Sequence, residues 1–140
     1  MVNNSKRSPP SKEKPSDQER KIQDGPCHSL DEVKALIRTS GYKAIRVATE
    51  KATQELSNYC MDEQDLAELI PKLKKDDYHD SEWCKFSETS PWFEADSYRI
   101  KQTEKLPSRR DLSNCKYYIK FAVNKLGSIL LFFSVHRDVL

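Results

Sequence analysis

The sequence predicts an α+β fold, in which helices pack on one face of an antiparallel sheet. Apolar residues recur at helical spacing between residues 29 and 73. Apolar and polar residues then alternate, as they do in strands, through 91–104, 116–124 and 128–136. Because the helical patterns come first and the strand patterns follow, we expect a single sheet with the helices gathered on one side.

The N-terminal part of the chain differs in composition from the rest. The first 26 residues contain only three sizeable apolar residues, no aromatic residue and four of the seven prolines. Such a segment buries too little surface to offset its ordering entropy. We therefore expect a disordered, basic and proline-rich tail over residues 1–27, followed by one domain over residues 28–140.

Charge and cysteine usage set modest bounds on function. The net charge is only +2, and the four cysteines contain no CxxC pair. The start of the chain lacks an apolar signal core, and the longest apolar run is five residues, far too short to span a membrane. We expect a cytoplasmic protein with reduced thiols. His79 and Cys84 alone are poor support for a metal site, and we expect none.

Capping residues mark the predicted helices. Ser29 begins a first helix, with Glu32 three residues later, and Gly41 ends it. Apolar residues follow at positions that face one side of that helix. The patterns further predict a short strand over 42–47, a second helix from Ala48, and a third helix that starts at Asp62 and ends near Pro71.

The last two strand patterns, 116–124 and 128–136, predict a β-hairpin with a three-residue loop. Pairing Asn124 with Ser128 brings the two apolar sets onto one face, whereas a slip of one residue would separate them. The sequence therefore predicts this register.

The predicted hairpin carries chemically active side chains on its other face. In the expected register Tyr118 faces Ser134, and His136 lies diagonally beside the tyrosine. This is either an acid/base and phosphate-binding cluster or a solvated histidine at a frayed hairpin end. His79, between two aspartates, is either a general base or part of a polar loop. The residues alone favour the two structural alternatives.

Five short segments occur in a recognisable order across residues 29–136. They are 29–37 with Gly41, Leu73 with 77–81, Trp92 with 98–99, 118–121, and 130–136. Their order and spacing resemble the MqsR family of type II toxin–antitoxin toxins, which are mRNA interferases with a RelE-like fold. The resemblance covers nearly the whole region expected to fold.

The resemblance implies a set of catalytic positions. The family uses two lysines, a glutamine and a tyrosine. The tyrosine is kept as Tyr118, and His136 stands where the family has its last lysine. The other lysine falls on Asp80 in an ungapped match and on His79 after a shift of one residue. The glutamine falls on Phe93 in an ungapped match and on Glu94 if an insertion is allowed.

The mechanism that the resemblance implies is attack of an RNA 2′-OH on the adjacent phosphate. It requires a base, an acid and cations, but no metal or other cofactor. His79 or Glu94 would be the base, and His136 the acid. Tyr118 would position the phosphate. The residues expected to supply positive charge to the RNA are Arg99, Lys120 and Arg137.

The resemblance also implies partners. We expect a cognate antitoxin protein and mRNA, and no membrane. Two alternatives of other classes remain. One is a catalytically inactive RelE-fold module that binds RNA or protein. The other is an interaction protein whose open sheet face docks a partner.

Overall fold

The computed structural model describes residues 7–140, and the sheet in this part of the chain has six strands. Their order is β1-β3-β4-β5-β6-β2, and every neighbouring pair is antiparallel except β2 and β6, which are parallel. The α+β class is confirmed. The strands are β1 (Lys21–Ile22), β2 (Ile45–Val47), β3 (Tyr78–Cys84), β4 (Phe93–Lys105), β5 (Leu112–Val123) and β6 (Leu130–Val139).

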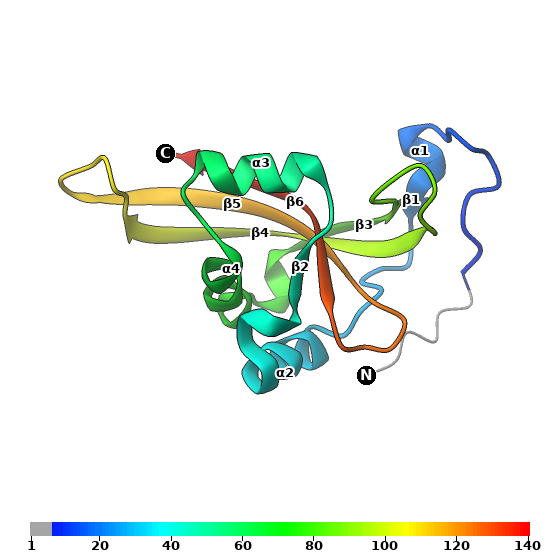
Figure 1. Cartoon of the computed structure of the whole chain (residues 1–140), viewed down its shortest axis with the longest axis horizontal. Coiled ribbons are helices and arrows are strands. Elements are labelled where there is room, and N and C mark those ends of the chain that lie inside the picture. The colour runs from blue at the N-terminus through cyan, green and yellow to red at the C-terminus, as the bar shows by residue number, and fades with distance from the viewer. Residues whose placement is uncertain (1–6) are drawn as a thin grey trace.

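Four helices accompany the sheet in the described residues (Figure 1). Helices α2 and α4 lie together on one side of the strands, whereas α3 lies beside β6. The expected order, with helices before strands, is found only in part, because β1 precedes α2 and β2 follows it. The helices are α1 (Asp17–Arg20), α2 (Leu30–Ser40), α3 (Glu50–Asn58) and α4 (Glu63–Leu69), with 3₁₀ turns at Gly41–Ala44, Ile70–Lys72 and Lys75–Asp77.

The capping residues act as the sequence predicts. The Ser29 side chain accepts a hydrogen bond from the Glu32 amide at 3.3 Å, and α2 ends before Gly41 at φ 60°. Asp62 caps α4 in the same way. Pro71 lies in the 3₁₀ turn that ends α4, because proline lacks the amide that a longer helix would need.

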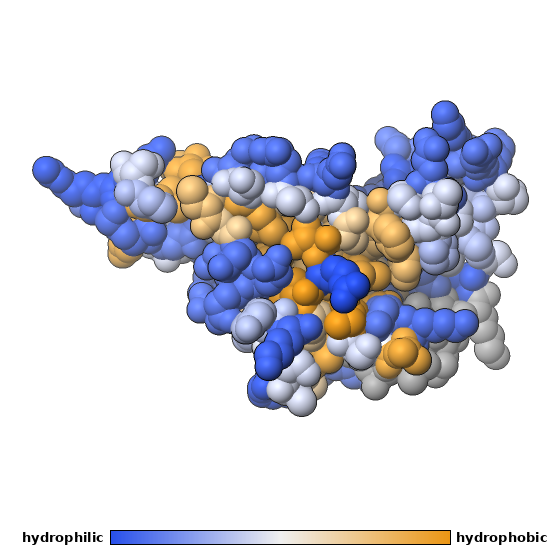
Figure 2. Space-filling model, in the orientation of Figure 1, coloured by the Kyte–Doolittle hydropathy of each residue, from blue (hydrophilic) through white to orange (hydrophobic). Residues whose placement is uncertain are grey.

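The main core lies between the sheet and the α2–α4 layer. Its centre is a row of rings on three neighbouring strands. Tyr98 stacks on Phe121, and Phe121 packs against Phe132, with 5.6 Å between ring centroids in both pairs. Burial of side chains of this size contributes roughly 1.5–3 kcal/mol each. Figure 2 shows apolar residues gathered between α3 and the α2–α4 layer, and hydrophilic residues over α1 and the tip of the β4–β5 hairpin.

The register of the last hairpin differs from the prediction. Val123 pairs with Leu130, whereas Asn124 was expected to pair with Ser128. The Asn124 side-chain oxygen accepts hydrogen bonds from the amides of Ser128 and Ile129 at 2.8 and 3.0 Å. These bonds hold both residues in the loop, so pairing begins one position later.

A bulge shifts the register again further along β6. Phe121 pairs with Phe132, but Lys120 pairs with Ser134, so Phe133 is the extra residue. As a result Tyr118 faces His136 directly, and the prediction that it faces Ser134 was wrong.

The expected disorder of residues 1–27 is wrong for residues 7–27, while residues 1–6 lie outside the described residues. Ile22 is buried, and β1 adds to the edge of β3. Arg7 forms ion pairs with Asp24 and the buried Glu94, at 2.8 and 2.9 Å. The composition argument failed because backbone pairing and ion pairs, rather than apolar burial, hold most of this segment.

The outer edge of β6 is covered as far as Arg137. β2 pairs with residues 130–132. Beyond them, the Glu55 carboxylate accepts from the Val135 amide at 3.2 Å, and the Tyr59 hydroxyl accepts from the Arg137 amide at 3.1 Å. Helix α3 and its C-cap residue Tyr59 thus satisfy amides that would otherwise form an open strand edge. No helix among residues 7–140 combines the length and apolar character needed to cross a membrane.

Candidate active site

The candidate site lies on the sheet face opposite α2 and α4, as a row across four strands. Arg99 on β4 pairs with Tyr118 on β5, which pairs with His136 on β6. On β3, a register irregularity between Tyr78 and Asp80 turns His79 onto the same face. The row therefore combines two histidines, an arginine and a tyrosine from four strands.

His79, Arg99 and Tyr118 are in mutual contact. The Arg99 Nη2 atom lies 3.1 Å from His79 Nε2. Because a guanidinium only donates, His79 Nε2 accepts in this contact and carries no proton there. The His79 and Tyr118 rings are 6.1 Å apart and nearly perpendicular, and Arg99 Cζ lies 5.9 Å from the Tyr118 ring centre. The cluster presents an imidazole lone pair beside a fixed cation.

Asp80 is held by the N-terminal segment. Lys21 Nζ lies 2.5 Å from its carboxylate, and the Ser97 hydroxyl donates to the same group. Burial acts to raise the pKa of Asp80, but these hydrogen bonds outweigh it, so the pKa lies below its ordinary value. Asp80 is therefore an anion that lies 4.0 Å from His79 Nε2.

Lys120 lies next to Tyr118, with its Nζ atom 5.8 Å from the ring centre. It forms an ion pair with Glu82, whose other oxygen lies 3.8 Å from Arg20. Burial acts to lower the pKa of Lys120, and the hydrogen bond to Glu82 outweighs it, so this pKa lies above its ordinary value. Lys120 is therefore a permanent cation at the site.

His136 is half exposed at the end of the row. Its Nε2 lies 2.8 Å from the Asp138 carboxylate, and its Nδ1 lies 3.4 Å from the Tyr59 hydroxyl. A Glu55 oxygen lies 4.0 Å from Nδ1. A protonated Nε2 would donate to Asp138, whereas the Tyr59 hydroxyl can either donate to Nδ1 or accept from it.

Glu94 lies on the opposite face of the sheet from this row. It is 4% exposed, and its carboxylate is paired with Arg7 at 2.9 Å. On β4 it follows the alternation of Asp96 and Tyr98, which face the interior. The structure does not bring Glu94 to the other predicted site residues.

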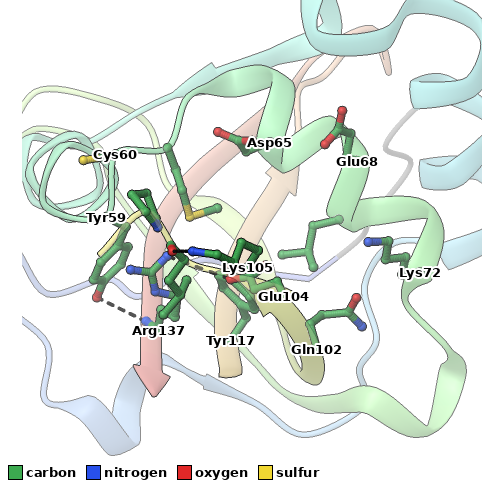
Figure 3. A pocket seen from close by; sticks show the side chains of 14 residues that line it. Tyr59, Cys60, Asp65, Glu68, Lys72, Gln102, Glu104, Lys105, Tyr117 and Arg137 are labelled. Atoms are coloured by element: carbon green, nitrogen blue, oxygen red, sulfur yellow. Dashed lines mark hydrogen bonds and ion pairs between the residues drawn. The ribbon is translucent and has the colours of Figure 1, made fainter. Parts of the chain in front are cut away.

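Arg137 also lies on the opposite face, where it lines a cavity of about 240 Å³ (Figure 3). Its guanidinium lies 4.7 Å from the Tyr59 ring centre and 3.9 Å from the Glu104 carboxylate. Glu104 also accepts a hydrogen bond from the Tyr117 hydroxyl. Arg137 therefore packs on the Tyr59 ring and points away from the row of His79, Arg99, Tyr118 and His136.

The sequence reasoning missed several residues around the row. The alternation along β3 would have placed Glu82 on the same face as Asp80. No pattern in the sequence indicated that Arg20 and Lys21 reach this face, because the segment that carries them has no apolar periodicity. Among residues 7–140, no three His, Cys, Asp or Glu side chains gather as a metal site would require.

Comparison with known families identifies the class of protein. The family model described as "Motility quorum-sensing regulator, toxin of MqsA" matches residues 25–134, which is well over half of the chain. The protein is thus the toxin component of a toxin–antitoxin system, and an antitoxin is its implied partner. The chain belongs to the MqsR toxin family, which confirms the resemblance. We found no match among curated proteins or among solved structures.

Proposed function

We propose that this toxin is a metal-independent endoribonuclease with a RelE-like site, acting on mRNA in the cytoplasm. The observation that carries the proposal is the row of His79, Arg99, Tyr118 and His136 on one sheet face. It offers a proton acceptor at one end, a proton donor at the other, and cations near the middle. These are the groups that transfer of a phosphodiester to its own 2′-oxygen requires.

The reaction forms a bond between the 2′-oxygen and phosphorus and breaks the bond from phosphorus to the 5′-oxygen. The 2′-OH proton goes to the base, and the acid supplies a proton to the leaving 5′-oxygen. The products are a 2′,3′-cyclic phosphate and a 5′-OH end. The nucleophile belongs to the substrate, so the protein has only to move two protons and stabilise the extra negative charge.

His79 is assigned as the base. Its Nε2 is already an acceptor in the contact with Arg99. Asp80, the other residue at this position of the family pattern, is occupied by Lys21 and Ser97. Asp80 instead balances the positive charge of Lys21 beside the site. Glu94, the alternative base, is buried on the other face and is not retained in this assignment.

His136 is assigned as the acid, because its Nε2 lies beside the Asp138 carboxylate, which accepts from a protonated imidazole. Tyr118, between the two histidines, positions the phosphate. Arg99 and Lys120 flank Tyr118 and supply positive charge to the developing phosphorane. Arg137 supports Tyr59 from the opposite face, so RNA contact is not assigned to it.

A binding module without catalysis is the second candidate function. The observation that favours it is the ion pair between Lys120 and Glu82, which neutralises one of the cations expected at the phosphate. This alternative predicts RNA binding without product formation.

The test incubates the full chain with an unstructured mRNA fragment in the presence of a metal chelator. We expect cleavage products with 2′,3′-cyclic phosphate and 5′-OH ends, and growth arrest on expression that the cognate antitoxin relieves. His79→Gln and His136→Gln should each lose cleavage while remaining folded. Binding without cleavage would support the second candidate, and absence of both binding and growth arrest would refute both.

A further inference from the structure

A basic groove lies along the open edge of β4, outside the row of catalytic residues. Pairing of β3 with β4 stops at Tyr98, so β4 continues past it without a neighbour strand on that side. The groove has a volume of about 410 Å³. Its charged lining residues are Lys72, Lys74, Arg99, Lys101 and Lys116, with one carboxylate, Asp77.

The positive charge of this groove is only partly balanced by the described part of the chain. Among residues 7–140, none of the four lysines forms an ion pair with a carboxylate. The Asp77 carboxylate instead accepts a hydrogen bond from the Lys74 backbone amide at 2.8 Å. Other cations near the site, such as Lys21 and Lys120, are paired with carboxylates.

Two of the lysines are placed at a cost to stability. Lys101 on β4 and Lys116 on β5 are direct cross-strand partners, and like charges in this position are destabilising. On its other side Lys116 faces Asp138, but that carboxylate contacts His136 instead. An anionic ligand in the groove would relieve the remaining repulsion between Lys101 and Lys116.

Arg99 joins the groove to the catalytic row, because it lines the groove and contacts His79. Lys72 and Gln102 line both the groove and the Arg137 cavity, and Figure 3 shows them at one side of that cavity. The groove thus begins beside His79 and continues along β4.

We propose that this groove binds the backbone phosphates of the RNA nucleotides next to the cleaved bond. This inference rests on the proposed function and names a second substrate-binding region for it. A single RNA strand carries one phosphate per nucleotide, and lysines along an open groove neutralise such phosphates with release of counterions. The groove adds affinity and length dependence, whereas the catalytic row acts on one phosphate.

The test uses two double variants. One carries Lys101→Gln and Lys116→Gln, and the other carries Lys72→Gln and Lys74→Gln. The control is the double variant of Lys43→Gln and Lys51→Gln. It removes the same charge from exposed lysines on the Gly41–Ala44 turn and on α3. The probes are uncleavable 2′-O-methyl oligonucleotides of three to nine residues. Binding is measured by fluorescence anisotropy from 50 to 300 mM salt.

We expect the wild-type chain and the control to bind longer oligonucleotides more tightly. Each groove variant should lose that gain in affinity. The slope of the logarithm of its binding constant against the logarithm of salt concentration should fall in magnitude by about 1.4, which is about 0.7 for each of two phosphate contacts. The melting temperature of the Lys101/Lys116 variant without RNA should not fall below that of the wild type, because a repulsive pair has been removed.

The outcomes separate this inference from the proposed function. If the wild type binds and cleaves RNA but both groove variants match the control, the groove inference is overturned and the catalytic proposal stands. If the wild type binds no RNA, the proposed function fails and the groove assignment fails with it. A third outcome is that the wild type binds a poly-glutamate peptide but no RNA, and that the groove variants lose this peptide binding. It would assign the groove to an acidic protein partner and overturn its assignment to RNA.

Discussion

Tyr118 and His136 are direct cross-strand partners, one on β5 and one on β6. Their Cβ atoms are therefore expected about 5 Å apart, and a phosphate held by the tyrosine lies within reach of the histidine. The pairing depends on the bulge at Phe133, since the unbulged register would have placed a different residue opposite Tyr118. The bulge thus determines which side chain can act with the tyrosine.

His136→Ala should reduce the cleavage rate by a factor on the order of 10²–10⁴, the usual contribution of one acid/base group. The fold should survive, because the side chain is half exposed. His136→Lys should restore part of the rate. It should also move the alkaline limb of the pH–rate profile upward, because an ammonium stays protonated to higher pH. Single-turnover rates from pH 5 to 9 measure both effects, and a wild-type rate in the alanine variant would refute the assignment.

Tyr118→Phe should reduce the rate less than His136→Ala does, because a hydroxyl that only positions phosphate moves no proton. The loss should appear mainly in KM, and oligonucleotide binding should weaken in parallel. A loss in kcat equal to that of His136→Ala, with KM unchanged, would instead make the tyrosine a proton-transfer group.

Glu94→Gln should leave the cleavage rate unchanged, because Glu94 lies on the other face from His79. It should lower stability, since it removes the buried partner of Arg7. Arg7→Gln serves as the matched variant, and a double-mutant cycle by urea unfolding should show coupling between the two positions. A large loss of rate in Glu94→Gln with the melting temperature intact would return the glutamate to the list of candidate bases.

Ile22→Ala should destabilise the protein by about 2 kcal/mol, the lower end for truncation of a buried side chain of this type. Ile22 is 8% exposed on β1. Leu126→Ala is the control, because that side chain is 79% exposed and its truncation should change stability by less than about 0.5 kcal/mol. Equal melting temperatures for the two variants would mean that the N-terminal segment does not pack on β3.

Lys21→Met should give a pH-dependent loss of stability through Asp80. The pKa of Asp80 is lower in the folded state than its unfolded value of about 3.9. Its contribution is therefore present above that value and is lost as pH falls through the folded pKa. The difference between wild type and variant should be about 1 kcal/mol or less at pH 7.

That difference should narrow as the pH falls below about 4, as urea unfolding at pH 7, 5 and 3.5 would show. Lys34→Met is the control, because Lys34 forms no ion pair among residues 7–140 and its effect should not vary over this range. A difference for Lys21→Met that grows on acidification would contradict the role given to the Lys21–Asp80 pair.

Local chemistry in the sequence was enough to predict α2, α3 and α4 and the strands β4, β5 and β6, but not α1 or β3. Ser29, Gly41 and Asp62 act through hydrogen bonds to residues within one turn, so neighbours in the sequence suffice. The hairpin of β5 and β6 was also predicted from residues that are close in the sequence. Its register was not, because the Asn124 loop and the bulge at Phe133 depend on contacts that alternation does not encode.

The candidate site was predictable in part. His79, Tyr118 and His136 were predicted from residue type and resemblance, and the structure places them in one row. The placement of Glu94 away from the row was predictable, since it lies five positions from Arg99 and an odd offset along a strand puts two side chains on opposite faces. Lys21 was not predictable, because only the tertiary fold brings it to Asp80.

The position of β6 in the sheet has a consequence for biosynthesis. This strand is the last of the six to leave the ribosome, yet it lies between β5 and β2 and carries His136. A nascent chain that stops before Leu130 leaves β2 without its partner and the β5 edge unpaired. Such a product lacks the proposed proton donor and cannot close the core. We therefore expect aborted translation to yield inactive fragments that are harmless to the cell that makes them.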